Sequence, residues 1–399
     1  MKTITSLAAL ALAAGSLAVA VPAAAEERNV TIAGMGAYTG VVRIFGQNSN
    51  AAMAAAAEQI NAEGGVTLAD GSTATLVHDY YDDRCNAEEG ISVLRRIAST
   101  NALVALGPTC SNVAEPQFGI LQSRIDDDGD TGLRMPVFTD VAIKADLAEM
   151  SDWVFRNVPS ETEMYDELFG WLREQHPDAR TIYGGVEEDF AHSRATWYTI
   201  MKPVAEKHGF ELLGAAEWLL NDTNFATQVR GMRRAEADIV AISAHPFTTC
   251  GVLREMSRQR VTPQVIVGLT SSSSDETLTG CAAEAEGMII PTSFAPVNDK
   301  AQAAADAVAA KGGSMDLHSA SAWENMFILR DVINAAGIEG RSDTVESDRR
   351  KVRDALAALE ETDGLLGVSQ RTPTGEAIKP YLFVHVDGGT WQVLHDPMM

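Results

Sequence analysis

Two adjacent side chains that can act as nucleophiles, Cys110 and Ser111, follow a Gly-Pro pair at 107–108 and open a segment of helical pattern. A helix N-terminus exposes backbone N–H groups and the positive end of the helix dipole. That setting lowers the pKa of a thiol and could activate Cys110, with His78 or His245 as the base of a thiol amidohydrolase. The same setting suits a carboxylate or another oxygen acceptor of a bound ligand, to which the Ser111 hydroxyl adds a donor. A third interpretation leaves Ser111 as a helix cap.

Other patterns that could do chemistry are incomplete. The glycines within 34–40 lack the spacing of a dinucleotide-binding loop, and no P-loop or G-x-S-x-G motif occurs. The acidic segment 126–130 lacks the distal glutamate of a calcium loop, which favours a solvated surface segment. His78 and the aspartates at 79, 82 and 83 could ligate a metal, but a loop beside a cleft is the favoured interpretation. We therefore predict no catalytic residue, no metal and no cofactor.

Strand and helix patterns alternate along most of the chain, which is typical of parallel sheets covered by helices on both faces. The first run has expected strands at 30–35, 75–81, 103–106 and 136–139, with helices between them. The alternation of strands and helices restarts after Pro159, with expected strands at 180–183, 211–220, 238–243 and 265–268. We expect a helix over 192–208 that is broken or bent near Pro203. We expect a strand at 287–291 to return toward the first lobe, three further helices to follow, and a hairpin over 381–394 to end the chain. The fold class is α/β with two similar lobes.

The composition excludes several classes of protein. The 399 residues are 46% hydrophobic and 22% charged, a globular balance that is inconsistent with disorder. A formal net charge of -24 would repel phosphate backbones, so we expect no nucleic-acid partner. Residues 1–25 combine Lys2, an apolar run and the small residues Ala23-Ala24-Ala25, which is the pattern of a cleaved signal peptide. We expect a protein exported to the periplasm.

Export also affects how the four cysteines are interpreted. An even number of cysteines in an oxidising compartment favours disulfides, and four cysteines allow three pairings. Cys85 and Cys110 are 25 residues apart, and Cys250 and Cys281 are 31 apart. Pairing in sequence order is the simplest choice, and we predict the disulfides Cys85–Cys110 and Cys250–Cys281.

Several short motifs, taken in order, resemble one family. They are Thr39-Gly40, Phe45-Gly46, the segment from Gln59 to Gly65, the segments 82–85 and 107–111, Asn224-Phe225 and Ala237-Asp238-Ile239-Val240. The chain resembles the type I periplasmic substrate-binding proteins of ABC importers, in the branched-chain amino acid and amide (Leu/Ile/Val-binding) group. The resemblance implies two lobes joined by a multi-strand hinge with a ligand cleft between them. We expect the first lobe to comprise 26–155 and about 292–365, and the second 156–291 and about 366–399.

The resemblance also implies a set of cleft residues. By position these ligand-binding residues are Phe45, Thr109, Cys110, Ser111, Thr139, Ala142, Ile143, Phe190, His245 and Thr270. Thr270 stands where amino-acid binders of the family carry an acidic residue for the ligand ammonium, and Ile143 replaces a hydroxyl residue. Because a buried ammonium needs an anionic or multiply hydrogen-bonding partner, these departures count against a zwitterionic ligand. Asp140 or Asp275 could compensate.

The function that the resemblance implies is capture of a small ligand by a monomer and its delivery to the permease subunits of an ABC importer, with no reaction on the ligand. The ligand classes are a branched-chain amino acid, an amide or a related carboxylate. Within the family the alternative is a receptor for an amide, a urea or an aromatic acid. From other classes, the alternatives are a ligand-sensing regulatory protein and the Cys110-dependent amidohydrolase.

Overall fold

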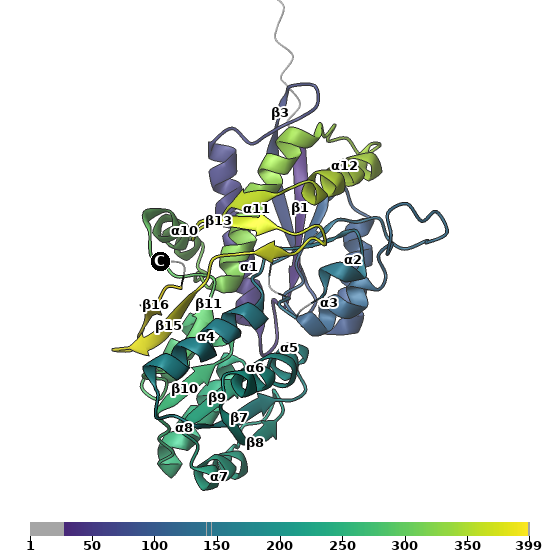
Figure 1. Ribbon diagram of the computed structural model, residues 1–399. Coiled ribbons are helices and arrows are strands. Elements are labelled where there is room, and N and C mark those ends of the chain that lie inside the picture. The colour runs from purple at the N-terminus through teal and green to yellow at the C-terminus, as the bar shows by residue number, and fades with distance from the viewer. Residues whose placement is uncertain (1–27, 141, 145, 398–399) are drawn as a thin grey trace, which may run out of the picture.

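The computed structural model describes residues 28–397 except 141 and 145, so the predicted signal peptide lies outside the described residues. The chain forms two lobes that lie end to end, and each lobe contains one large sheet (Figure 1). The first-lobe sheet has the order β2-β3-β1-β4-β5-β6. Its strands are β1 (Asn29–Gly36), β2 (Val66–Thr67), β3 (Thr73–Asp82), β4 (Val104–Leu106), β5 (Val137–Thr139) and β6 (Val154–Arg156). All pairings are parallel except that of β2 with β3.

Six helices cover the first-lobe sheet. They are α1 (Arg43–Ala62), α2 (Ala87–Ala98), α3 (Ser111–Phe118), α10 (Asp299–Ala310), α11 (Leu317–Ala336) and α12 (Val345–Ala357). The alanine-rich stretch of α1 allows α11 to pack closely against it. Their apolar faces meet β1 and β3 in one core that includes Met53, Leu76, Met326 and Leu329. The last helices of the chain thus return to complete the first lobe.

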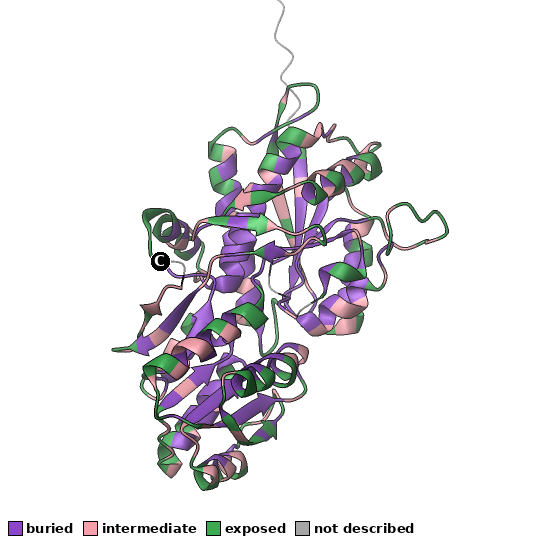
Figure 2. Ribbon diagram, in the orientation of Figure 1, coloured by how far each residue is buried: buried purple, intermediate pink, exposed green. Residues whose placement is uncertain are grey.

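The second-lobe sheet has the order β16-β15-β11-β10-β9-β7-β8. Its strands are β7 (Thr181–Glu187), β8 (Glu211–Trp218), β9 (Ile239–Ser243), β10 (Val265–Gly268), β11 (Ile289–Thr292), β15 (Leu382–Asp387) and β16 (Thr390–His395). The helices are α4 (Glu161–Gln175), α5 (Ala191–Ala195), α6 (Lys202–Lys207), α7 (Ala226–Ala235), α8 (Pro246–Gln259) and α9 (Asp275–Cys281). Buried residues fill the central strands of both sheets, whereas the edge strand β16 has none, and exposed residues lie on the outer sides of the helices (Figure 2).

Two expectations for the second lobe can be made more exact. The strand expected at 287–291 forms as β11, which pairs with β10 and β15 inside the second sheet, and the chain crosses to the first lobe after it. The irregularity expected near Pro203 in the 192–208 helix is a π-helical segment, Thr196–Met201, that separates α5 from α6. Pro203 lies in the first turn of α6, where its missing N–H is tolerated. The C-terminal hairpin forms as predicted, from β15 and β16.

The chain crosses between the lobes after β6, after β11 and before β15. A small sheet of β12 (Glu361–Asp363), β13 (Val368–Arg371) and β14 (Ala377–Ile378), which the sequence did not predict, lies in the last crossing. The buried carboxylate of Glu324 on α11 accepts a hydrogen bond from Asn157 Nδ2 at 3.0 Å and pairs with Lys379. Arg156 pairs with Glu376 at 2.7 Å. These contacts tie the first and last crossings together.

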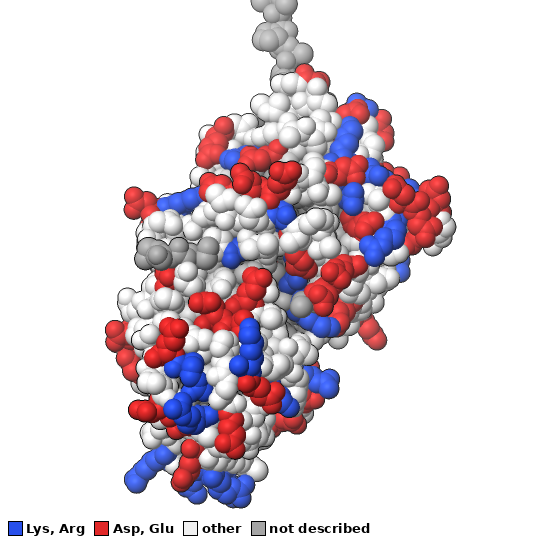
Figure 3. Space-filling model, in the orientation of Figure 1, with Lys and Arg blue, Asp and Glu red and all other residues white. Residues whose placement is uncertain are grey.

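Both predicted disulfides, Cys85–Cys110 and Cys250–Cys281, are present. The first links the loop after β3 to the start of α3, and the second links α8 to α9. Acidic side chains with basic ones among them cover both lobes on the face shown in Figure 3, in keeping with the net charge of -24. Within residues 28–397, apart from 141 and 145, no helix is long and apolar enough to cross a bilayer.

Candidate functional site

One small cavity lies between the lobes and is lined from both sides. Its wall consists of Phe45, Thr109, Cys110, Ser111 and His318 from the first lobe and Phe190, His192, His245 and Ser271 from the second. Six of the ten predicted site residues are in this wall. The cavity volume is about 10 Å³. Because a single water needs roughly 10–15 Å³, an organic ligand can enter only when the lobes separate.

Glycines bring the first-lobe wall into place. Gly107 has φ +124°, and a Cβ there would lie 2.1 Å from the carbonyl oxygen of Met35. Gly36 ends β1 so close to the next loop that a Cβ would lie 1.9 Å from Thr109 Oγ1. Only glycine permits such approaches, so the strand ends can converge and turn the loop after β4 toward the cleft. Thr109 is thereby placed at the cavity.

The start of α3 supplies hydrogen-bond donors to the cavity. Ser111 is the first residue of this helix and is 2% exposed. Its Oγ accepts a hydrogen bond from the backbone N–H of Lys144 at 3.3 Å, so its O–H can donate to a ligand. Cys110 holds the N-cap position, where no side-chain cap is formed. The interpretation of Ser111 as a helix cap is therefore wrong, because Ser111 is the first residue inside the helix.

The disulfide also decides the chemistry of Cys110. Its sulfur is bonded to Cys85, and the described residues contain no free cysteine. A sulfur in a disulfide has no thiolate to attack a substrate. The structure thus contradicts Cys110 as the nucleophile of an amidohydrolase.

The second-lobe wall holds two buried carboxylate–histidine pairs. His192 Nε2 lies 2.9 Å from Glu161 Oε1, and His245 Nδ1 lies 2.5 Å from Glu187 Oε1. Thr196 donates to Glu161 at 2.6 Å. All four members of the two pairs are buried.

These partners set the protonation state of both glutamates. Burial alone would raise the pKa of Glu161, but the charge of His192 and hydrogen bonds from His192, Thr196 and Thr270 together lower it. The pKa of Glu187 is lowered in the same way against burial, by His245 and by Thr248. Each carboxylate is therefore already hydrogen-bonded within the second lobe.

Aromatic rings pack around these pairs. The rings of Phe190 and His245 lie 4.2 Å apart between centroids. Phe45 meets His318 edge to face at 4.7 Å. The cavity thus combines apolar ring faces with hydrogen-bonding groups, a mixture typical of sites for small organic molecules.

His318 differs from the other two histidines of the wall. It is 1% exposed, and neither ring nitrogen has a hydrogen-bond partner among the residues that the structure describes. Burial lowers the pKa of His318 well below its usual range, and the charges of His192 and His245 lower it further. Its imidazole is therefore neutral near pH 7, with one nitrogen donating and the other accepting.

Four predicted site residues lie outside the cavity wall. Thr139 is buried at the end of β5, where its carbonyl accepts from Asn325. Ala142 is buried as well, and its carbonyl accepts from Arg156. Ile143 lines a separate 250 Å³ pocket beside Glu161. Thr270 is buried, and its hydroxyl donates a hydrogen bond to the carboxylate of Glu161. Their contact with a ligand stays a prediction.

The two aspartates proposed as substitutes for an ammonium partner are also outside this wall. Asp140 is 1% exposed, and burial raises its pKa to about 7. Asp83, buried near it, has a pKa raised by burial to about 7. Asp275 lines a different, 570 Å³ cavity next to β16.

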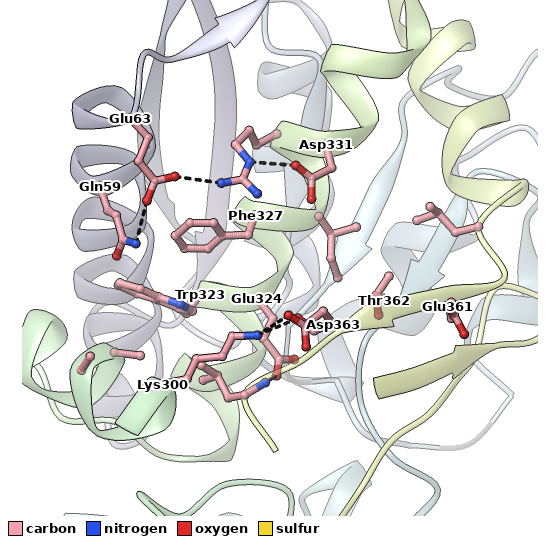
Figure 4. A pocket seen from close by; sticks show the side chains of 16 residues that line it. Gln59, Glu63, Lys300, Trp323, Glu324, Phe327, Asp331, Glu361, Thr362 and Asp363 are labelled. Carbon is pink, nitrogen blue, oxygen red and sulfur yellow. Dashed lines mark hydrogen bonds and ion pairs between the residues drawn. The ribbon is translucent and has the colours of Figure 1, made fainter. Parts of the chain in front are cut away.

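The cleft cavity is not the largest hollow of the molecule. A 520 Å³ pocket lies on the first lobe between α1, α10, α11 and β12, with Trp323 and Phe327 as its floor (Figure 4). Its lining contains two ion pairs, Glu63 with Arg330 at 3.0 Å and Lys300 with Asp363 at 2.8 Å. Because no buried side-chain polar atom among the described residues of this lining lacks a hydrogen-bond partner, we take the cleft as the candidate functional site.

Sequence reasoning missed three residues of the wall, His192, Ser271 and His318. His192 lies two residues after the predicted site residue Phe190, in the segment that follows β7, so its position was a usable signal. His318 lies on a helix that reaches the cleft only because the chain crosses back to the first lobe. No group of three or more histidine, cysteine or acidic side chains in the described part of the chain is arranged to hold a metal.

Comparisons with known proteins agree with this architecture. Residues 29–390 match the family described as periplasmic binding protein. The leucine-, isoleucine-, valine-, threonine- and alanine-binding protein of Pseudomonas aeruginosa is 23% identical over 350 residues, which are 86% of this chain and 86% of its own.

Solved structures share the fold. The leucine-binding protein of Thermotoga maritima has a TM-score of 0.78 at 16% identity, covering 92% of this chain and 99% of its own. A solute-binding protein of R. palustris in complex with benzoate has a TM-score of 0.75 at 15% identity, covering 92% and 96%. The family match runs from β1 into the C-terminal hairpin and includes every residue of the cavity wall. The chain belongs to the periplasmic binding protein family.

Proposed function

We propose that this protein is the solute receptor of an ABC importer. It captures a small organic molecule between its lobes and delivers it to the membrane permease without altering it. The observation that carries the proposal is the cavity whose wall is shared by both lobes, with Phe45 and Ser111 on one side and Phe190 and His245 on the other. A ligand that contacts both sides stabilises the closed form by its differential affinity for that form.

The chemistry of the wall favours a ligand with an oxygen-bearing head and an apolar body. The Ser111 hydroxyl and the start of α3 suit a carboxylate or a carbonyl oxygen. Phe45 and Phe190 suit an aromatic or aliphatic body. Both glutamates near the cavity are already paired with His192 and His245, so an α-ammonium finds no available anion. A carboxylic acid, an aromatic acid or an amide fits better than a zwitterionic amino acid.

Among the similar proteins, some bind amino acids and others bind an aromatic acid. One binds leucine and other amino acids, by its name, and another structure holds benzoate. We also propose that the segment 1–25 directs export and that the mature protein acts in the periplasm as a monomer. The predicted bounds of the two lobes remain part of the proposal.

A thermal-shift screen tests the receptor function. Benzoate, 4-methylpentanoate, benzamide, urea and leucine are each added to the mature protein, since a ligand of the native state raises the melting temperature by mass action. We expect a carboxylate or amide to raise it, and small-angle scattering to show compaction with the same compound. A hit that leaves the scattering curve unchanged would argue against closure of the cleft around the ligand. The same hit retained by the double variant Phe45→Ala/Phe190→Ala would place binding elsewhere.

A further inference from the structure

His318 is the one histidine of the cavity wall without a carboxylate partner. His192 and His245 each face a buried glutamate at hydrogen-bond distance, whereas both nitrogens of His318 lack a partner within the described residues. An unsatisfied buried polar group destabilises a fold, and such groups are rare in native proteins. A residue that carries two of them at a ligand cavity is therefore expected to gain partners when a ligand binds.

The ring of His318 is held by packing. The residue lies in the first turn of α11, whose N-cap Asp316 accepts from the backbone N–H groups of His318 and Ser319, both at 2.9 Å. The ring then meets Phe45 edge to face. Backbone capping and ring packing fix the imidazole, so its nitrogens are preorganised for a ligand.

The charges around His318 favour a neutral group. His192, His245 and Glu161 act on it from the second lobe. Asp316 lies on its own helix, where burial raises the pKa of the carboxyl. The imidazole is neutral, so it can donate through one nitrogen and accept through the other. A ligand hydroxyl or amide can also do both, whereas an ammonium can only donate.

We propose that His318 is a specificity-determining residue that hydrogen-bonds a neutral hydroxyl or amide group on the apolar body of the ligand. This inference rests on the proposed function, in which the head of the ligand binds at Ser111. The ligand class is thereby narrowed to hydroxylated or amide-bearing organic acids.

Paired ligands that differ only in a hydroxyl test the proposal. Benzoate, 3-hydroxybenzoate and 4-hydroxybenzoate are titrated by calorimetry into the wild type, His318→Leu and His318→Gln. We expect the wild type to bind at least one hydroxybenzoate about tenfold or more tightly than benzoate, because a site built for a hydroxyl rejects the analogue that lacks it. His318→Leu should lose that preference, and His318→Gln should keep part of it, since its amide both donates and accepts. A preference retained in His318→Leu overturns the proposal.

A second measurement needs no ligand. Replacing a buried group that lacks hydrogen bonds by an apolar side chain of similar size removes a destabilising desolvation. We expect His318→Leu to raise the melting temperature of the ligand-free protein by about 2 °C or more. His176→Leu, at the half-exposed end of α4, is the matched control and should not raise it. A lowered melting temperature for His318→Leu would mean that the nitrogens have internal partners, and it overturns the proposal.

The binding measurement and the melting temperature together distinguish failure of this inference from failure of the receptor function. If the wild type binds none of the benzoates but another compound of the thermal-shift screen, the aromatic-acid ligand fails while the melting temperatures still decide the role of His318. If no compound binds and His318→Leu is destabilised, both the proposed ligand chemistry and the inference are contradicted.

Discussion

Phe45 of the first lobe and His245 of the second meet edge to face across the cleft, with ring centroids 6.1 Å apart. The two residues belong to α1 and to the start of α8, and they are joined in sequence only through the crossings between the lobes. This contact exists only while the lobes are together. It therefore couples the shape of the ligand cavity to closure.

Phe45→Ala should shift the protein toward an open form. Loss of the ring contact with His245, which crosses the cleft, removes about 0.5–1.5 kcal/mol from the closed state. Small-angle scattering of the ligand-free variant should give a larger radius of gyration than the wild type. Phe247→Ala, a change at an exposed ring on the same lobe as His245, is the control. Identical curves for Phe45→Ala and the wild type would show that this contact does not hold the lobes together.

Ser111→Ala should weaken ligand binding more than it weakens the fold. The hydroxyl caps no helix, so its removal affects mainly its hydrogen bonds with Lys144 and with the ligand. Loss of a hydrogen bond to a charged ligand group lowers affinity by about 1.5–3 kcal/mol, roughly 10- to 100-fold. Calorimetry with the best compound of the screen measures the affinity, and thermal unfolding measures stability. An unchanged affinity with a lowered melting temperature would reverse this assignment.

The two disulfides should differ in their effect on binding. Their loops span 25 and 31 residues, so the chain-entropy estimate gives each a similar stabilisation of about 3–4 kcal/mol. Cys110 lines the cavity, whereas Cys250 and Cys281 are buried in the second lobe away from it. The double variant Cys85→Ala/Cys110→Ala should lose both stability and affinity. Cys250→Ala/Cys281→Ala, the matched control, should lose stability alone. Equal losses of affinity in both would contradict a special role for the first disulfide.

Asp140→Asn should stabilise the protein at pH 8 and change little at pH 4. Burial raises the pKa of Asp140 from 3.8 to about 7. Between these values the unfolded chain loses the proton and the folded protein keeps it, so stability falls as the pH rises and levels off above about pH 7. The asparagine removes this loss, which amounts to at most about 4 kcal/mol.

Denaturant unfolding at several pH values measures the difference between Asp140→Asn and the wild type. Asp128→Asn, at an exposed site, serves as control. A gain in stability that does not change between pH 4 and pH 8 would show that the carboxyl of Asp140 does not titrate as its burial implies.

Local sequence signals located the part of the site that follows β4, because Thr109 and Ser111 lie at a strand end, where ligands of parallel sheets bind. Phe190 and His245, which follow β7 and β9, came only from the resemblance to the family. Hydrophobic runs also marked the strands that carry them. The approach of these loops to one cavity rests on two glycines, Gly36 and Gly107, whose role depends on contacts with distant residues.

The rest of the site depends on long-range topology. His318 reaches the cavity because the chain returns to the first lobe after β11, and no local pattern marks that residue. Glu161 opens α4 directly after the first crossing and meets His192, 31 residues later. The short strands β12 and β14 have too few residues to give a periodic signal, so the small third sheet was not predicted.

Parallel calorimetric titrations of leucine, 4-methylpentanoate and benzoate test the central claim most directly, since the first two differ only in the α-ammonium. Because both glutamates beside the cavity are already paired, an unpaired ammonium should weaken binding by several kcal/mol, about two to four decades of affinity. We predict that at least one of the two carboxylates binds with a Kd in the micromolar range or tighter and that leucine binds at least 100-fold more weakly. Leucine binding as tight as that of the carboxylates, or tighter, would contradict the account.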